Sequence, residues 1–287
     1  MNINKWFELN THDLSGVNIA ITGSTGGLGE WICMHLARLN ANLIFLNRDS
    51  TKSITLENKI KVIYPNVDIQ YIETHLEDLT SVNNSINKLK AMSVDMLILN
   101  AGVYNIPVYK MDSGYNNIFQ INFLSQYYIA KELLPNLTKS SYGKIVALGS
   151  IAHNYSKLDD SDVDFSTRTK PSLIYGNSKR FLMASLQELL KDHVVKLSIV
   201  HPGITLTNMT NHYPKCINWL VKFGIKCIFP SPKIASLSII KGIFDHTEYN
   251  TWIGPSIFNI WGKPKKVKLK TIPESEKIYE ITKNIIT

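Results

Sequence analysis

Residues 17–29 of the chain read VNIAITGSTGGLG, and this stretch decides the fold. Its first seven residues are mostly apolar, which predicts a buried strand, and a helix is expected over residues 27–40. A glycine turn between a strand and a helix lets main-chain N–H groups approach a pyrophosphate, and the helix N-terminus favours the anion. No Gly-Lys-Ser/Thr follows, so the turn is not a P-loop. The stretch predicts the first unit of a nucleotide-binding sheet, with a tight turn that binds nothing as the alternative.

The same alternation of apolar strand and helix continues along the chain. Further strands are expected over residues 42–48, 67–74, 95–102, 143–150, 196–203 and 251–255, and further helices over residues 113–134 and 175–192. Near-continuous apolar strands separated by helices are typical of a parallel sheet that is covered on both faces. We therefore predict an α/β fold, a doubly wound Rossmann-type sheet in one domain over residues 1–287. A lid is expected at about residues 205–232, and a basic C-terminal extension at about residues 256–287.

Composition and charge exclude several classes of protein. Three cysteines, with no CxxC, HExxH or Cys/His cluster, argue against a disulfide scaffold and against a metal site. The low cysteine count and the lack of an apolar signal segment at the start together predict a cytoplasmic protein. The net charge of +8 is concentrated in KPKKVKLK at residues 263–270, and the rest of the chain has 26 basic against 23 acidic residues. We therefore expect no nucleic-acid partner, and we interpret the basic segment as a solvated tail.

The glycine turn resembles that of the short-chain dehydrogenase/reductase superfamily. Thr22, Gly23, Gly27 and Gly29 fit its TGxxxGxG pattern. With Gly26 in place of Gly27, the same residues fit the TGxxGxxG pattern of the extended branch, which contains epimerases and dehydratases. The turn alone does not choose between the two.

The end of the second strand predicts which nucleotide is bound. An acidic residue there selects NAD through the ribose 2′-hydroxyl, whereas a basic residue accepts the 2′-phosphate of NADP. Here Asn47 takes the place of the acid and Arg48 follows it. Since an arginine can engage a phosphate bidentately, we predict NADP(H) as the preferred cofactor. Two alternatives remain: Arg48 is solvated or pairs with Asp49, or Asp49 reaches the ribose and NAD(H) is used.

The resemblance implies further cofactor contacts. His75 stands before Leu76, where many family members have an aspartate that meets the adenine. Here the adenine is bound by the His75 ring or by the backbone alone, or His75 is a surface histidine without a role in binding. Asn100-Ala101-Gly102 resembles the family's NNAG motif, and residues 201–207, HPGITLT, resemble its PGxVxT segment, with a structural role expected for His201. The cofactor-binding set implied by the resemblance is Thr22, Gly23, Ser24, Thr25, Gly27, Leu28, Gly29, Arg48, His75, Leu76, Asn100, Ala101, Gly102, Tyr175, Lys179, Pro202, Gly203, Thr205 and Thr207.

Tyr175 and Lys179 form a YxxxK pattern, whose spacing places both side chains on one helix face. A neighbouring ammonium is expected to lower the pKa of the tyrosine from its ordinary value of about 10. The resemblance implies that Ser150, at the end of VALGS, polarises a substrate carbonyl, and that Asn122 completes the catalytic tetrad by holding a water near Lys179. A structural hydrogen bond is the alternative role for Asn122.

The 25 positions between Ser150 and Tyr175 leave a long inserted loop over residues 151–173. With Arg48 and the segment MDSGY at residues 111–115, this loop is similar to that of the retinol dehydrogenase-like branch. Many members of that branch prefer NADP and act on lipophilic alcohols, aldehydes or ketones. Apolar residues of the expected lid, at positions 217–229, could line a pocket for such a substrate; ordinary packing, or contact with a membrane surface through Lys222 and Lys226, are the alternatives.

The joint pattern predicts an oxidoreductase that transfers a hydride between a nicotinamide and a small-molecule carbonyl or alcohol. Tyr175 is expected to be the general acid/base, and a homodimer or homotetramer is expected from related enzymes. Two rival functions remain. One is a nucleotide-sensing protein without catalysis, and the other is an extended-type epimerase or dehydratase, which needs a larger C-terminal domain than the roughly 80 residues after Gly203 provide.

Overall fold

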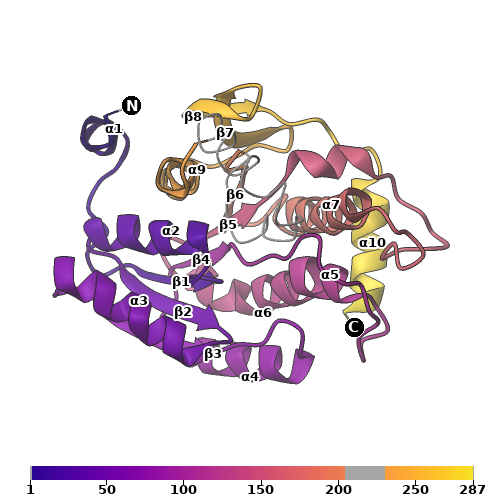
Figure 1. Ribbon diagram of the computed structural model, residues 1–287, viewed down its shortest axis with the longest axis horizontal. Helices are drawn as coiled ribbons and strands as arrows, with labels where there is room; N and C mark the ends of the chain where they lie inside the picture. Colours follow the sequence, from indigo (N-terminus) through magenta and orange to yellow (C-terminus); the bar gives the residue numbers. More distant parts are fainter. Residues whose placement is uncertain (1, 204–229, 287) are drawn as a thin grey trace, which may run out of the picture.

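The computed structural model describes residues 2–203 and 230–286, and its centre is an eight-stranded sheet (Figure 1). The strands lie in the order β3-β2-β1-β4-β5-β6-β7-β8, and every neighbouring pair is parallel except β7 and β8. Their bounds are β1 Asn18–Thr22, β2 Asn42–Asn47, β3 Ile69–Glu73, β4 Met96–Leu99, β5 Lys144–Leu148, β6 Lys196–Val200, β7 Thr251–Ile257 and β8 Trp261–Lys268. The predicted doubly wound α/β fold is confirmed.

Helices cover both faces of the sheet because successive side chains of each strand point to opposite faces. In β1, Ile19 and Ile21 belong to one apolar core, whereas Ala20 belongs to the other. The first core is completed by α1 Ile3–Asn10, α2 Gly27–Arg38, α3 Ser50–Ile63 and α9 Pro232–Phe244. The second is completed by α4 Leu79–Lys90, α5 Asn117–Phe119, α6 Ser125–Lys139, α7 Pro171–Leu189 and α10 Ser275–Ile285.

The strand order reverses beside β1, which pairs with β2 on one side and with β4 on the other. In open parallel sheets a crevice forms beyond the carboxyl ends of the strands at such a reversal. The glycine turn follows β1 directly, so the topology places it in this crevice.

The C-terminal part of the chain differs from the sequence-based expectation. Instead of a solvated extension after a last strand at residues 251–255, Trp261–Lys268 forms β8, antiparallel to β7 at the edge of the sheet. Prolines and lysines had hidden this strand, but both are tolerated at a sheet edge, where lysines discourage pairing with other chains. The chain then returns through α10, which packs against α7.

Two other predicted elements have different bounds. The helix expected over residues 113–134 is α5, a π-helical turn η1 (Gln120–Leu124) and α6 in succession. The loop expected over residues 151–173 begins with a 3-10 helix, η2 (Ile151–Tyr155), and α7 already starts at Pro171, because proline is favoured in the first helical turn. Most of the expected lid, residues 205–229, lies outside the described residues.

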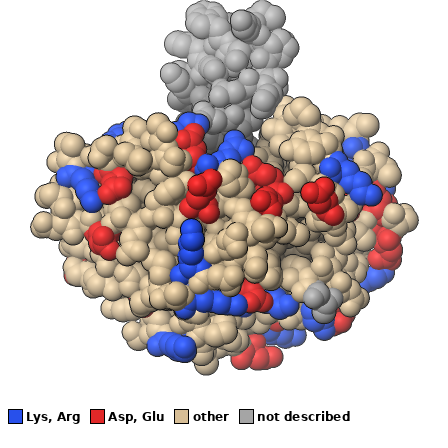
Figure 2. All heavy atoms as spheres, turned by 90° about the horizontal axis from the view of Figure 1, so that it is seen from below, with Lys and Arg blue, Asp and Glu red and all other residues tan. Residues whose placement is uncertain are grey.

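Charged side chains of both signs are interspersed on the face seen in Figure 2. Among the described helices, none combines the length and the hydropathy required to cross a bilayer. Residues 2–203 and 230–286 also hold no group of three or more His, Cys, Asp or Glu side chains placed to bind a metal ion.

Candidate active site

A cavity of about 630 Å³ lies in the crevice at the carboxyl ends of the strands. Glycine-turn residues line one part of it, and Ser150, Tyr175 and Lys179 line another. The predicted site residues that line it are Gly23, Thr25, Gly27, Leu28, Gly29, Arg48, Leu76, Asn100, Ala101, Gly102, Ser150, Tyr175, Lys179, Pro202 and Gly203. Thr22, Ser24, His75 and Asn122 lie outside the lining, and Thr205 and Thr207 fall outside the described residues.

Glycines shape the turn after β1 because side chains would not fit there. Gly23 has a φ of 67°, a left-handed conformation that favours glycine. A Cβ on Gly29 would lie 2.2 Å from the carbonyl oxygen of Gly23, so the first turn of α2 packs directly on the loop. The loop and the start of α2 thus form a cradle of main chain at a helix N-terminus, which suits a phosphate group.

Thr22 and Asn100 hold this turn against β4. Only Asn100 also lines the cavity. The hydroxyl of Thr22 accepts hydrogen bonds from the main-chain N–H groups of Asn100 and Ala101, each at 3.0 Å. The Asn100 amide donates in turn to the carbonyls of Thr22, at 3.0 Å, and Gly23, at 2.9 Å. Thr22 therefore positions the turn, whereas Asn100 also borders the cavity.

Asn47, which the sequence analysis considered only as a missing acid, braces the turn from the other side. Its side-chain oxygen accepts from the main-chain N–H of Ser24 at 2.9 Å. Its amide nitrogen donates to the hydroxyls of Ser24, at 2.6 Å, and Ser53, at 3.0 Å. All three side chains are buried, so Ser24 serves the loop and not the cavity. The sequence signal for this role was an amide residue, Asn47, at the end of an apolar strand.

Arg48 lies beside the cavity with a side chain that is 71% exposed. Its Nη1 atom is 3.7 Å from Oε1 of Glu77, an acidic neighbour that the sequence analysis missed. The alternative pairing with Asp49 is not what the structure shows. Asp49 caps α3 by accepting from the N–H of Lys52 at 2.9 Å, and its carboxylate pairs with the Lys52 ammonium at 3.1 Å.

His75 is a surface histidine that pairs with acids and does not line the cavity. Its Nε2 lies 2.9 Å from Oε1 of Glu73, and this contact, together with Glu77, raises the pKa of the ring. The expected contact between its ring and an adenine is therefore not supported. The neighbouring Thr74, Leu76 and Glu77 border the cavity instead.

Ser150 and Tyr175 come from different elements and line the same cavity. Ser150 follows β5, and its Oγ accepts from the N–H of Ala152 at 3.2 Å. Tyr175 lies in the first turns of α7, and burial raises the pKa of its phenol to about 12, while hydrogen bonding to the Ser150 hydroxyl partly opposes this. The ring of Tyr104 packs edge-on against that of Tyr175, with centroids 5.2 Å apart.

Lys179 lies one helical turn after Tyr175, as the spacing predicts, and its Nζ is 5.9 Å from the centre of the tyrosine ring. The ammonium donates to the carbonyl of Leu148 at 3.0 Å, and burial lowers its pKa to about 8. The expectation that Lys179 lowers the pKa of Tyr175 is wrong for this arrangement. Burial raises the tyrosine pKa, and Lys179 is not among the groups that shift it.

Asn122 is fully buried in the π-helical turn and makes structural hydrogen bonds. Its side-chain oxygen accepts from Val103 N–H at 2.7 Å, and its amide donates to the Val103 carbonyl at 2.9 Å and to the Ser178 hydroxyl at 3.1 Å. A Cβ on Gly102 would lie 3.3 Å from Asn122 Oδ1 and 3.6 Å from Lys179 Nζ. The two predicted tetrad members therefore approach the same glycine, while the structural alternative for Asn122 also holds.

His201 borders the cavity from the end of β6 and stacks on Trp252, with ring centroids 5.0 Å apart and an angle of 12° between the planes. Burial lowers its pKa to about 4, so the ring is neutral at physiological pH. This arrangement agrees with the structural role expected for His201.

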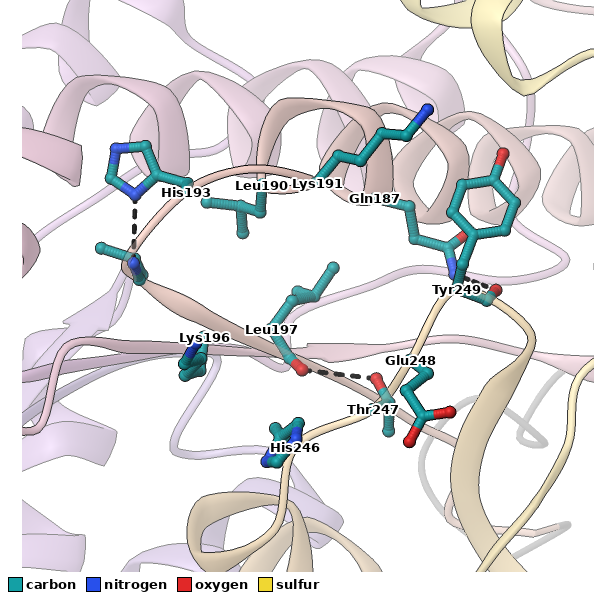
Figure 3. A pocket seen from close by; sticks show the side chains of 11 residues that line it. Gln187, Leu190, Lys191, His193, Lys196, Leu197, His246, Thr247, Glu248 and Tyr249 are labelled. Carbon is teal, nitrogen blue, oxygen red and sulfur yellow. Dashed lines mark hydrogen bonds between the residues drawn. The ribbon is translucent and has the colours of Figure 1, made fainter.

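A smaller cavity of about 190 Å³ lies at the start of β6 (Figure 3), whereas His201 borders the larger cavity beyond the other end of this strand. Its polar groups bind one another: His193 accepts from Val195 N–H, Thr247 donates to the Leu197 carbonyl, and Gln187 donates to the Tyr249 carbonyl. These contacts close the junction between α7, β6 and β7. None of the predicted site residues within the described ranges lines this cavity.

The order of these parts matches a known family. The family model for short chain dehydrogenases matches residues 17–216, which include the glycine turn, Ser150, Tyr175 and Lys179. The chain belongs to the short-chain dehydrogenase/reductase superfamily. It is therefore an oxidoreductase that acts on CH–OH and C=O groups, and within the superfamily it groups with the retinol dehydrogenase-like branch.

Relatives agree with this assignment, and solved structures share the fold. The chain is 27% identical to human polyprenol dehydrogenase over 249 residues, which cover 80% of this chain and 76% of the relative. It is 29% identical to mouse retinol dehydrogenase 12, over 72% of this chain and 67% of the relative. A crystal structure of an uncharacterized protein from Mycobacterium paratuberculosis shares the fold with a TM-score of 0.74 and 22% identity, covering 96% of this chain and 95% of the other. A Sphingobium yanoikuyae short-chain dehydrogenase solved with NADPH has a TM-score of 0.59 and 19% identity, covering 79% of this chain and 84% of the other.

Proposed function

We propose that the protein is an NADP(H)-dependent oxidoreductase that acts on lipophilic carbonyl compounds or alcohols, with Tyr175 as the general acid/base. The observation that carries the proposal is that Ser150, Tyr175 and Lys179 line the same cavity as the glycine turn. An acid/base pair and a phosphate cradle in one crevice suit hydride transfer to a carbonyl carbon.

The residues present fit a dinucleotide. The main-chain cradle at Gly23 and Gly29 exists only because neither residue has a side chain, and it would hold the pyrophosphate. Arg48 would accept the 2′-phosphate that distinguishes NADP from NAD, and Lys179 would bind the nicotinamide ribose. When bound, the nicotinamide supplies or accepts the hydride.

The protein's own groups handle the substrate oxygen and its proton. Ser150 orients and polarises the carbonyl, and Tyr175 donates a proton to its oxygen. Burial raises the pKa of Tyr175 to about 12, so at neutral pH the phenol holds the proton that it would donate to the carbonyl oxygen. Lys179 returns a proton to Tyr175, and Asn122 would hold the water that takes part in this relay; both side chains approach Gly102.

An apolar substrate is supported by the apolar and aromatic side chains in the cavity lining, which include Val103, Tyr104, Ile121, Ile151 and Tyr155. Two of the relatives are named for polyprenol and retinol, which are lipophilic alcohols. The rival extended-type function loses support, because the C-terminal residues form β7, β8 and α10 of the same sheet and its cover.

The test is a Tyr175→Phe substitution, with Tyr142→Phe as the matched control on an exposed loop. A panel of retinoid, steroid and small carbonyl substrates is reduced with NADPH and with NADH side by side. We expect Tyr175→Phe to lower kcat by roughly 100- to 10,000-fold, while NADPH binding, followed by fluorescence, is retained. Near-normal turnover of Tyr175→Phe would overturn the assignment, and an NADH preference of the wild type would overturn the choice of cofactor.

A further inference from the structure

Three polar residues behind Ser150 belong to none of the motifs that define the site. His153 lies in η2, Arg180 follows Lys179 on α7, and Glu274 directly precedes α10. His153 is 1% exposed and Arg180 is 5% exposed. We propose that these three residues form a positioning network that holds the main chain at Ser150 for proton transfer. This inference rests on the proposed function of Ser150.

His153 holds the Ser150 carbonyl oxygen with two donors. Its main-chain N–H donates at 3.1 Å, and its ring Nδ1 lies 2.6 Å from the same oxygen. A carbonyl oxygen only accepts, so Nδ1 carries the proton. The peptide after Ser150 is thereby held in place, and the Ser150 Oγ accepts from the Ala152 N–H. Together these bonds leave the serine hydroxyl hydrogen free to point at Tyr175 and the substrate oxygen.

Packing holds the plane of the His153 ring. The ring lies edge-on to Trp252, with centroids 5.8 Å apart, and Trp252 stacks in turn on His201 at the cavity wall. Gly176 lets η2 approach α7 closely, because a Cβ there would lie 2.3 Å from the Ala152 carbonyl oxygen. The loop after Ser150 is therefore fixed from two sides.

Arg180 connects this loop to the C-terminal part of the chain. Its Nη1 donates to the His153 carbonyl at 3.2 Å, and its Nη2 forms an ion pair with Glu274. A buried guanidinium requires a charged partner, so the orientation of Arg180 depends on Glu274. The C-terminal segment is thus in contact with the rear of the active site, one residue away from Lys179.

Three substitutions of His153 test the network. Asparagine places an amide N–H close to the position of Nδ1, glutamine places it nearer to Nε2, and leucine removes it. We expect His153→Asn to keep kcat within about threefold, whereas His153→Gln and His153→Leu lose roughly 10- to 100-fold in kcat with little change in KM for NADPH. If all three variants lose stability alike while kcat per folded molecule stays at the wild-type value, the network does not position Ser150.

A double substitution tests the Arg180–Glu274 arm without leaving a buried charge. Arg180→Leu/Glu274→Leu removes both charges, and we expect a fall in kcat similar to that of His153→Leu. A wild-type kcat in the folded double variant would exclude this arm from the network.

Hydrogen exchange separates the network from the proposed function. We expect the peptide that contains the Ala152 amide to exchange at least 10-fold faster in His153→Leu than in His153→Asn, measured on the protein without substrate. Unchanged exchange would overturn the network, whatever the enzyme reduces. If the Ala152 peptide exchanges faster in His153→Leu as expected, but Tyr175→Phe keeps its activity, the network stands and only the proposed function is overturned.

Discussion

The ammonium of Lys179 donates a hydrogen bond to the carbonyl of Leu148 over 3.0 Å. Leu148 is the last residue of β5, two positions before Ser150, so this bond ties the catalytic helix α7 to the strand that carries the serine. Lys179 therefore has a part in the geometry of the site besides the proposed transfer of protons.

Replacing Lys179 with methionine, which keeps an unbranched side chain and removes the ammonium, is expected to abolish most activity. We expect kcat for carbonyl reduction to fall by about 100-fold or more, because Tyr175 is no longer reprotonated and the bond to Leu148 is lost. Lys191→Met, at an exposed position after α7, is the matched control. A Lys179→Met enzyme with near-normal kcat and a native circular-dichroism spectrum would exclude Lys179 from the proton relay.

Removing the Arg48 side chain is expected to weaken NADPH selectively. Arg48→Ala should raise KM for NADPH by about 10-fold and leave KM for NADH nearly unchanged, because only NADPH has the 2′-phosphate. The effect is moderate because the arginine is exposed and solvent screens its charge. Steady-state kinetics with both cofactors measure the ratio, and equal changes for the two would contradict a phosphate contact.

Glu77 offers the opposite change at the same place. Its carboxylate lies 3.7 Å from Arg48 and would repel a phosphate bound there. Glu77→Gln should therefore lower KM for NADPH relative to NADH, by a few-fold at low ionic strength, and the gain should shrink with added salt. A gain for NADH of the same size would show that Glu77 acts on the cavity in general.

A methyl group at Gly176 is expected to destabilise the protein, although alanine favours helices. The added Cβ would lie 2.3 Å from the Ala152 carbonyl, so η2 must move away from α7. We expect Gly176→Ala to lower the free energy of unfolding by about 1–3 kcal/mol, a typical cost of overpacking. Urea unfolding measures it. Helix propensity alone would favour alanine by about 1 kcal/mol. A gain in stability of this size would therefore contradict the close packing of η2 on α7.

Stability in alkaline solution should depend on Lys144, a buried lysine at the start of β5. Its ammonium donates to the carbonyls of Ile243, at 2.6 Å, and Asp245, at 2.7 Å, and burial lowers its pKa from 10.5 to about 8. Between these two pH values the unfolded chain holds the proton that the folded protein has released. The free energy of unfolding therefore increases with pH in this window.

Lys144→Met removes this contribution. From pH 8 to pH 10.5 the wild type should gain on the order of 2 kcal/mol relative to the variant, measured by urea unfolding at each pH. Comparing the two proteins cancels the other groups that titrate in the window, among them Lys179 and the buried tyrosines. Parallel pH profiles for wild type and variant would show that the folded protein does not lower the pKa of Lys144.

The sequence by itself determined the fold class and the order of the motifs. Apolar strands, the glycine turn after β1 and the i,i+4 spacing of Tyr175 and Lys179 are local patterns, and each depends only on neighbouring residues. The edge strand β8 escaped recognition because its lysines and prolines carry no apolar period, and its place depends on pairing with β7.

Only the tertiary structure decided the surroundings of each site residue. Whether Arg48 meets Asp49 or Glu77, and whether His75 faces a cavity or Glu73, depends on how β2, β3 and the following loops pack. The pKa of Tyr175 is set by burial, which no spacing reveals. The contact of Arg180 with Glu274 joins residues 94 positions apart. Hydrophobic periodicity depends on residues that are neighbours in the chain, whereas the partners of polar groups depend on which distant segments come together in the fold.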